Sequence, residues 1–239
     1  MFKDKTKFIL KDLSKLEKIS GLKFKNTDLW HQALTHRSYL NEHKDWPYGQ
    51  NERLEFLGDA VLELITTQYI YNKFNLPEGR LTSLRASLVN TESLANLARK
   101  INLDKFIYLS KGQAHSLAHA KKHILANTLE AFLGALYLDQ GFKAVQKFLS
   151  THLLKKAGFI LRHQLYKNPK STFQEIAQSR FQITPRYQTV KEVGPSHSKT
   201  FTVKLMLNSK TISHGTGKSK QEAEIEAAKK ALSKYAQRA

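Results

Sequence analysis

The chain has 239 residues, of which 41% are hydrophobic and none is cysteine. This length and apolar content suffice for one large or two ordinary globular domains, and they exclude a chain that is disordered throughout. The lack of cysteine excludes disulfides, thiolate zinc sites and cysteine nucleophiles, which fits a reducing compartment. With 39 Lys and Arg against 20 Asp and Glu, the formal net charge is +19, which indicates a polyanionic partner such as DNA, RNA or anionic lipid, and a basic composition that serves only solubility stays an alternative.

The apolar stretches are too short to cross a membrane. The run "AFLGALYL" at 131–138 is among the longest, and it is far below the roughly 20 residues that a spanning helix needs. Lysines interrupt every apolar stretch at the N-terminus, so no signal-peptide core is present there. We therefore expect a soluble, cytoplasmic protein without a membrane partner.

The chain up to residue 167 is predicted to be a succession of helices. Apolar residues recur at spacings of three and four, and sustained period-two alternation is absent, which is typical of an all-α domain. Glycines and prolines mark the breaks between the helices. The predicted helices cover residues 27–41, 51–74, 78–101, 123–141 and 142–161.

A domain boundary is predicted between residues 167 and 168. Helical periodicity stops there, and the sequence "NPKS" at 168–171 supplies a break and a fresh helix start. The domains are therefore expected to be residues 1–167 and 168–239. The second should be a small α+β domain in the order α-β-β-β-α, with an antiparallel sheet, formed by a helix at 171–181, strands at 184–193, 198–208 and 210–217, and a helix at 219–235.

The predicted helix at 51–74 concentrates acids in an otherwise basic chain. At about 100° per residue, Glu52, Glu55, Asp59 and Glu63 fall in one sector roughly 80° wide, opposite the apolar face. A solvated acidic surface is one interpretation. The other is a site for a hard divalent cation, which takes oxygen ligands together with substrate phosphates. The basic composition favours the second, because bare carboxylates would repel a phosphate backbone unless a metal neutralised both.

Three further residues bear on this helix. Phe56 lies at the edge of the acidic face, which suggests a contact with a second subunit. Gly58 costs the helix about 1 kcal/mol relative to alanine, which is tolerable where another backbone approaches closely. Glu130 stands alone among apolar residues of another helix, with Asn127 three residues earlier on the same face, and it needs a cation if it faces inward. His36, by contrast, is interpreted as a satisfied buried histidine.

The segment "NERLEFLGDAVL" at 51–62 closely resembles the signature of the ribonuclease III family, endonucleases that cleave double-stranded RNA. The segments "ALTHRSYLNEH" before it and "LPEGRLTSLRASLVNTESLANLA" and "ILANTLEAFLGALYLDQGF" after it agree with the family in order. The C-terminal layout and "GKSKQEAEIEAAKKAL" are similar to a double-stranded RNA-binding domain. The resemblance covers essentially residues 15–235.

The resemblance implies a metal-dependent nuclease. Glu55, Asp59 and Glu130 match the family's metal ligands, with Asp59 and Glu130 catalytic, and Asn127 matches the fourth ligand position. Glu52 and Glu78 match acids that border the site. The family uses Mg²⁺, for which Mn²⁺ substitutes, to hydrolyse a phosphodiester in each RNA strand. The products carry 5′ phosphates, 3′ hydroxyls and short 3′ overhangs.

The implied partners are double-stranded RNA and a second copy of the chain, not a small-molecule substrate. The family works as a homodimer with one site per chain, and the expected role is processing of ribosomal RNA precursors and some messenger and transfer RNAs. Asn127 departs from the usual Asp, so metal affinity should fall. A variant active at higher Mg²⁺, an engineered change that traps substrate, and a double-stranded RNA-binding protein with impaired or no cleavage remain open.

Two regions of the second domain are expected to contact RNA. Ser219 and Glu222 have the spacing of a capping box, and Lys218 and Lys220 beside them favour a phosphate site at the helix start. Ser171 is expected to cap the domain's first helix. The resemblance adds minor-groove contacts from Gln174, Glu175 and His197 to the RNA contacts expected from Lys218, Ser219 and Lys220. Such contacts read A-form shape over roughly 16 base pairs. A solvated helix residue at Glu175 and a flexible turn residue at His197 stay alternatives.

Overall fold

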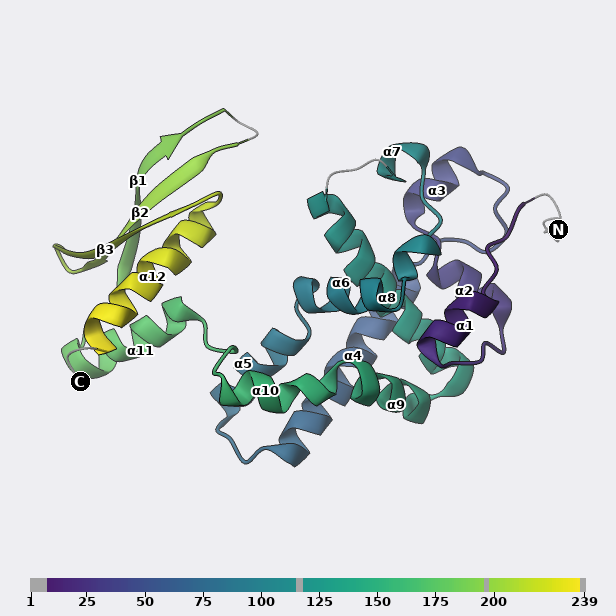
Figure 1. The fold of residues 1–239 in the computed structure, drawn as a ribbon, viewed down its shortest axis with the longest axis horizontal. Coiled ribbons are helices and arrows are strands. Elements are labelled where there is room, and N and C mark those ends of the chain that lie inside the picture. The colour runs from purple at the N-terminus through teal and green to yellow at the C-terminus, as the bar shows by residue number, and fades with distance from the viewer. Residues whose placement is uncertain (1–7, 115–117, 196–197, 237–239) are drawn as a thin grey trace. The chain divides into compact units, whose positions relative to one another are not determined.

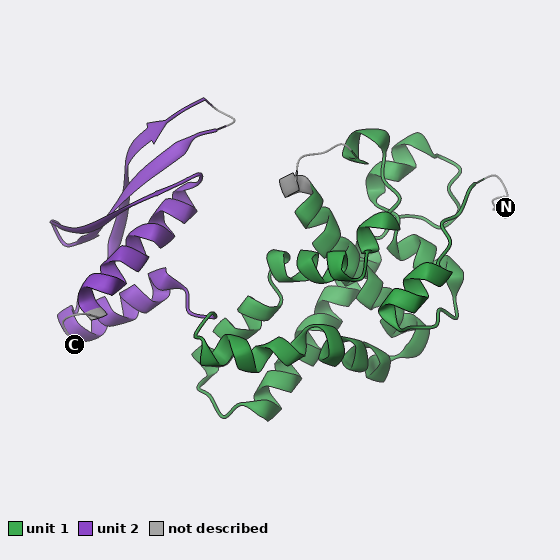
Figure 2. Cartoon of the chain, in the orientation of Figure 1, with its two compact units in different colours: residues 1–165 green, residues 166–239 purple. Residues whose placement is uncertain are grey.

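The computed structural model describes residues 8–114, 118–195 and 198–236. The chain divides into two compact units, residues 1–165 and 166–239, which Figure 2 distinguishes by colour. The sequence places the boundary two residues further on, after residue 167. Each unit has its own core of buried apolar side chains, so each is described by itself.

The first unit is helical, and the prediction of an all-α domain is confirmed. Figure 1 labels its α-helices along the chain; the described residues of this unit also form two short 3₁₀ helices, η2 and η3. The helices are α1 Ser14–Ser20, α2 Thr27–Ala33, α3 Arg37–Glu42, α4 Glu52–Lys73, α5 Glu78–Leu88, α6 Thr91–Lys100, η2 Leu103–Lys105, α7 Lys111–Ala114, α8 Ala118–Gln140, α9 Phe142–His152, η3 Leu154–Lys156 and α10 Ala157–Arg162.

Helices α4 and α8 form the centre of this unit. They contact each other along their length, and α2, α6 and α9 pack against α8 (Figure 1). Leu62 and Ile65 of α4 and Leu129 and Phe132 of α8 are almost fully buried. Burial of such side chains stabilises the unit by about 1.5–3 kcal/mol each, so the two helices that carry the acidic residues also form the core.

Three predicted helices are interrupted in the structure. The predicted helix at 27–41 ends at Ala33 and restarts at Arg37, because the Thr35 carbonyl accepts the Asn51 amide at 2.9 Å and the His36 amide donates to the Tyr108 carbonyl at 3.1 Å. The predicted helix at 78–101 breaks before Asn90, whose side chain caps α6. The predicted helix at 142–161 becomes α9, η3 and α10.

The second unit has the predicted α-β-β-β-α order. Its sheet is antiparallel with strand order β1-β2-β3, and Phe173, Leu205 and Ala227 are buried where α11 and α12 cover it. The expected cap at Ser171 is wrong: Asn168 accepts the Lys170 amide at 3.0 Å, so the helix begins earlier. The elements are α11 Pro169–Phe181, β1 Arg186–Val193, β2 Thr200–Leu207, β3 Lys210–Gly217 and α12 Lys220–Ala236.

Among the helices of the described ranges, none is both long enough and apolar enough to pass through a lipid bilayer.

Candidate active site

The crossing of α4 and α8 brings the predicted acidic residues onto neighbouring surfaces. A Cβ atom added to Gly58 would lie 2.6 Å from the Glu130 carbonyl carbon and 2.8 Å from the Gly134 amide nitrogen, and a Cβ added to Gly134 would lie 3.1 Å from the Gly58 nitrogen. Only glycines permit this approach. The mid-helix position of Gly58 predicted such a close backbone contact, and the structure shows it. Glu55 and Asp59 flank the crossing on α4, and Glu130 lies at it on α8.

The carboxylates at this crossing repel one another. Burial raises the pKa of Glu130 to about 7, and the charges of Asp59, Glu55 and Glu63 add to this rise. Burial also raises the pKa of Glu55, with Glu52 and Asp59 contributing. These carboxylates are therefore close enough to interact, in surroundings that disfavour negative charge.

A hollow of about 390 Å³ opens beside Glu55, and we call it the α4–α8 hollow; Asp59 and Glu130 are not among the residues that line it. Glu52 and Glu55 line it from α4, and Asn127 lines it from α8. Glu52 is held by Gln50, whose Nε2 donates to it at 2.9 Å. The remaining lining residues are His36, Arg37, Asn51, His123 and Ile124. The lining of the hollow thus combines two acids of α4 with basic, polar and apolar groups.

The oxygen atoms at the crossing suit a hard divalent cation. Three carboxylates and one amide supply them, and Mg²⁺ binds oxygen ligands through one or two carboxylates, water and substrate phosphates. Glu55, Asp59 and Glu130 form no ion pair with another described residue. No three His, Asp or Glu side chains within the described ranges yet converge closely enough to enclose a metal. Mutual repulsion favours separated carboxylates, and a bound cation would reverse that preference.

Two other predicted acids lie away from the α4–α8 hollow. Glu78 begins α5, accepts the Thr82 hydroxyl at 2.8 Å, and lines a different hollow beside Tyr71. Glu63 pairs with Arg85 at 3.0 Å. Within one chain, therefore, Glu52 lines the α4–α8 hollow, whereas Glu78 lines a different one.

Phe56 is 82% exposed, which is unusual for a large apolar side chain. It lies beside a second hollow of about 700 Å³, to which Leu29, Leu57 and Leu138 contribute apolar surface. Leu138 is itself exposed. An exposed aromatic side chain next to an apolar hollow is typical of a protein contact surface.

The predicted RNA-contacting residues that the structure describes lie in α11 and at the start of α12. Gln174 and Glu175 are exposed near the start of α11. The Ser219 hydroxyl accepts the Glu222 amide at 3.1 Å, and Glu222 accepts the Lys218 amide at 2.8 Å, so the cap forms as the spacing predicts.

Of the two lysines at this cap, Lys218 is exposed and Lys220 pairs with Glu192 at 3.4 Å. His197 lies outside the described residues. The predicted phosphate site thus includes one lysine whose charge is partly offset by a neighbouring acid.

His36 and Arg37 are lining residues that sequence reasoning missed. His36 was expected to be a satisfied buried histidine; it is only half-buried, its Nδ1 contacts the Ser38 hydroxyl at 2.8 Å, and it lines the α4–α8 hollow. Arg37 pairs with Glu52 at 3.5 Å. The signal available in the sequence was the adjacent His-Arg pair, which alone does not reveal what surrounds it.

Comparison with known proteins identifies both units. Residues 26–157 match the Ribonuclease-III-like family, and residues 169–235 match the double-stranded RNA binding motif. Ribonuclease 3 of Carboxydothermus hydrogenoformans is 46% identical over 222 residues, which cover 92% of this chain and 94% of that protein. Ribonuclease 3 of Enterococcus faecalis is 43% identical over 222 residues, which cover 92% and 95%.

A solved structure agrees with the sequence matches. The nuclease domain of ribonuclease III from Campylobacter jejuni superposes with a TM-score of 0.55 at 38% identity, covering 61% of this chain and 98% of that one. The chain therefore belongs to the ribonuclease III family, as an endoribonuclease of the ribonuclease III type that carries a C-terminal double-stranded RNA-binding domain.

Proposed function

We propose that the chain cleaves double-stranded RNA by hydrolysis that depends on Mg²⁺, with Mn²⁺ as a substitute. The observation that carries the proposal is the contact between Gly58 and Gly134, which sets the oxygen atoms of α4 beside those of α8. Glu55, Asp59 and Glu130 would hold the cation, and Asn127 would contribute an uncharged oxygen.

The reaction breaks the bond between phosphorus and the 3′ oxygen of the RNA strand. A water molecule adds its oxygen to the phosphorus and loses a proton, and the departing 3′ oxygen gains one, which leaves a 5′ phosphate and a 3′ hydroxyl. A bound Mg²⁺ supplies activation of this water and stabilises the charge on the phosphate. Asp59 of α4 and Glu130 of α8 would orient this water.

The enzyme is proposed to act as a homodimer with one site per chain. In a symmetric dimer the same patch meets itself, so a projecting group on each chain needs a recess on the other. Phe56 and the adjacent hollow lined by Leu29, Leu57 and Leu138 satisfy this requirement. The nuclease domain of ribonuclease III from Campylobacter jejuni also has a region involved in dimer formation. Two sites in one dimer could then cut both strands, leaving short 3′ overhangs.

The second unit is proposed to select duplex RNA by its shape. Gln174, Glu175 and His197 would reach the shallow minor groove, and Lys218 and Lys220 would contact phosphates. Base-paired stretches of ribosomal RNA precursors and of some messenger and transfer RNAs are the substrates that we expect. Any duplex of sufficient length should bind, because A-form geometry does not depend on sequence.

A second candidate function is double-stranded RNA binding with impaired or no cleavage. The observation that favours it is Asn127, an uncharged residue at the mouth of the α4–α8 hollow. Loss of one negative charge lowers affinity for a divalent cation. The two functions therefore differ in their dependence on metal concentration.

The test is incubation of an end-labelled RNA duplex with the full-length protein over a series of Mg²⁺ and Mn²⁺ concentrations. We expect metal-dependent cleavage to products with 5′ phosphates. Asp59→Asn and Glu130→Gln should abolish cleavage and keep duplex binding, whereas Glu63→Gln, an acid on the same helix as Asp59 but paired with Arg85, should cleave normally. Binding without cleavage at every metal concentration would favour the second candidate.

A further inference from the structure

His36 is held rigidly at the edge of the α4–α8 hollow. Its backbone amide donates to the Tyr108 carbonyl at 3.1 Å, and the neighbouring Thr35 carbonyl accepts the Asn51 amide at 2.9 Å. Asn51 is buried and immediately precedes α4, so these bonds fix the position of His36 relative to the acidic helix. Few degrees of freedom remain for its side chain.

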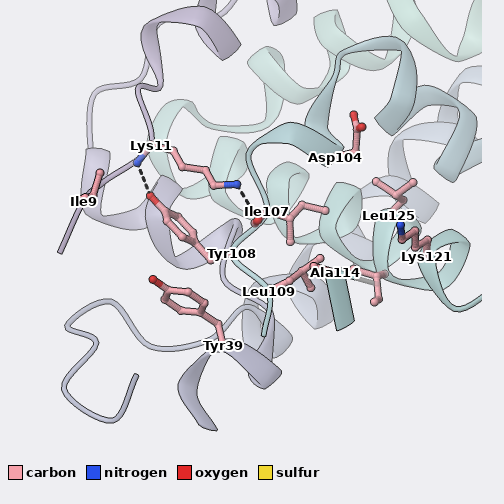
Figure 3. Close-up of a pocket in the computed structure, with 11 residues that line it drawn as sticks. Ile9, Lys11, Tyr39, Asp104, Ile107, Tyr108, Leu109, Ala114, Lys121 and Leu125 are labelled. Atoms are coloured by element: carbon pink, nitrogen blue, oxygen red, sulfur yellow. Dashed lines mark hydrogen bonds between the residues drawn. The ribbon is translucent and has the colours of Figure 1, made fainter. Parts of the chain in front are cut away.

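The segment that holds His36 is itself braced from the other side. Lys11 donates its backbone amide to the Tyr108 hydroxyl at 2.8 Å and its Nζ to the Ile107 carbonyl at 2.9 Å, as the dashed lines in Figure 3 show. The hollow drawn there, of about 540 Å³, is lined by none of the predicted site residues. Its polar contacts serve to support Tyr108.

The hydrogen bonds of His36 define which ring nitrogen carries the proton. The Ser38 backbone amide donates to Nδ1 at 3.2 Å as the cap of α3, and the Ser38 hydroxyl lies 2.8 Å from the same nitrogen. A nitrogen that accepts an amide hydrogen bond has no proton of its own, so Nε2 carries the proton in the neutral ring. Burial and the charge of Arg37 lower the pKa of His36, which favours the neutral ring.

The Nε2–H group is therefore a hydrogen-bond donor at the α4–α8 hollow. No described residue accepts a hydrogen bond from Nε2, although His36 lines the hollow with Glu55 and Asn127. A protonated nitrogen cannot ligate a metal, which excludes His36 as a further metal ligand. The acids nearby would repel an anion, but Glu52 is already bonded to Gln50 and paired with Arg37, and the Arg37 guanidinium adds positive charge at the same edge.

We propose that His36 binds the substrate directly, donating its Nε2–H to a phosphate oxygen of the RNA strand that enters the α4–α8 hollow. The inference rests on the proposed function, because it requires an RNA backbone beside the carboxylates. A donor that lines the same hollow as Glu55 would fix the strand without adding a charge that competes with the cation. Fixing the reacting group in this way raises the rate of cleavage.

Two substitutions separate this role from the capping role. Asparagine is a favourable helix cap, so His36→Asn keeps the bond to the Ser38 amide but is too short to place a donor where Nε2 lies. His36→Gln reaches the Nε2 position with an amide donor but caps poorly. His163→Asn, at an exposed histidine that packs on Phe159, is the matched control.

Single-turnover cleavage of an RNA duplex at saturating Mg²⁺ is measured together with the thermal midpoint. We expect His36→Asn to melt like the wild type and to cleave about 10- to 100-fold more slowly, as for loss of a hydrogen bond to a charged group. His36→Gln should recover most of the rate and melt lower, and the control should match the wild type. Wild-type cleavage by His36→Asn, or rates that follow the melting temperatures, would overturn the proposal.

A second readout does not depend on cleavage. In protein with ¹⁵N-labelled histidine, the His36 ring signal, assigned by its loss in His36→Asn, should show a protonated Nε2 that shifts when an RNA duplex is added. An unshifted signal at saturating duplex would refute the role of His36 even if the enzyme cuts. A wild type that fails to cleave at every metal concentration would instead refute the proposed function, and the ring signal would still decide the role of His36.

Discussion

Removal of the Glu130 charge should stabilise the metal-free protein, although it removes a proposed ligand. The pKa of Glu130 rises from an ordinary 4.5 to about 7 on folding, chiefly because of burial and then because of Asp59 and Glu55. The folded state therefore binds the proton more tightly than the unfolded state. Stability is unaffected below pH 4.5, falls as the pH rises from 4.5 to 7, and stays low above that range.

The size of this effect follows from the pKa change. One pKa unit corresponds to about 1.4 kcal/mol, so the full change corresponds to about 3 kcal/mol, and solvent screening of a half-buried group leaves about 1–2 kcal/mol. Glu130→Gln should recover this free energy of unfolding at pH 8 and should raise the thermal midpoint by about 2–8 °C. At pH 4 the two proteins should melt together.

The assay is thermal unfolding of the chelator-treated protein at both pH values. Glu92→Gln is the control, because the pKa of Glu92 is shifted in the opposite direction: a hydrogen bond from Lys122 lowers it. Removal of the Glu92 charge should therefore not raise the thermal midpoint. Added Mg²⁺ should shrink the advantage of Glu130→Gln. Equal midpoints of Glu130→Gln and wild type at pH 8 would refute the claim that the Glu130 charge destabilises the folded protein. A midpoint of Glu130→Gln raised by the same amount at pH 4 as at pH 8 would also refute it.

Three other substitutions test the surrounding architecture. Gly58→Ala should lower the free energy of unfolding by about 1–3 kcal/mol, because the added Cβ collides with the Glu130 backbone. Gly79→Ala, which has open space around it, should be neutral or stabilising by up to about 1 kcal/mol. Equal effects of the two substitutions in denaturant titrations would contradict the close crossing of α4 and α8. Asn127→Asp should lower the Mg²⁺ concentration for half-maximal cleavage about tenfold, and an unchanged requirement would place Asn127 outside the site. Phe56→Ala should shift sedimentation from dimer to monomer, whereas Phe159→Ala, also exposed, should not; a dimer in both variants would place the interface elsewhere.

The helices that bear the site could be predicted because their cores follow a simple period. Helix α4 was expected at 51–74 and spans Glu52–Lys73, since its apolar residues repeat over six turns. The break between α2 and α3 could not be predicted, because bonds from Asn51 and Tyr108, distant in the chain, turn the backbone at Thr35 and His36. Local patterns contain no information about such partners.

The candidate site was likewise only partly readable. The spacing on α4 grouped Glu55 with Asp59, and Gly58 predicted a close neighbour, but only the fold identifies that neighbour as Gly134 of α8. The link to Glu130 came from family resemblance, and the structure supports it by placing both helices at one crossing. His36 was not predicted as a binding residue, because a half-buried histidine that caps a helix has the same sequence signature whether or not its second nitrogen contacts a ligand.

The central claim is that oxygen atoms of α4 and α8 hold one divalent cation site. It is tested most directly by a crystal structure of the full-length protein with Mn²⁺, located by anomalous scattering. We predict a peak at the crossing of the two helices, about 2.0–2.3 Å from carboxylate oxygens of Glu55, Asp59 and Glu130. Anomalous density elsewhere in the protein, with none at this crossing, would contradict the account.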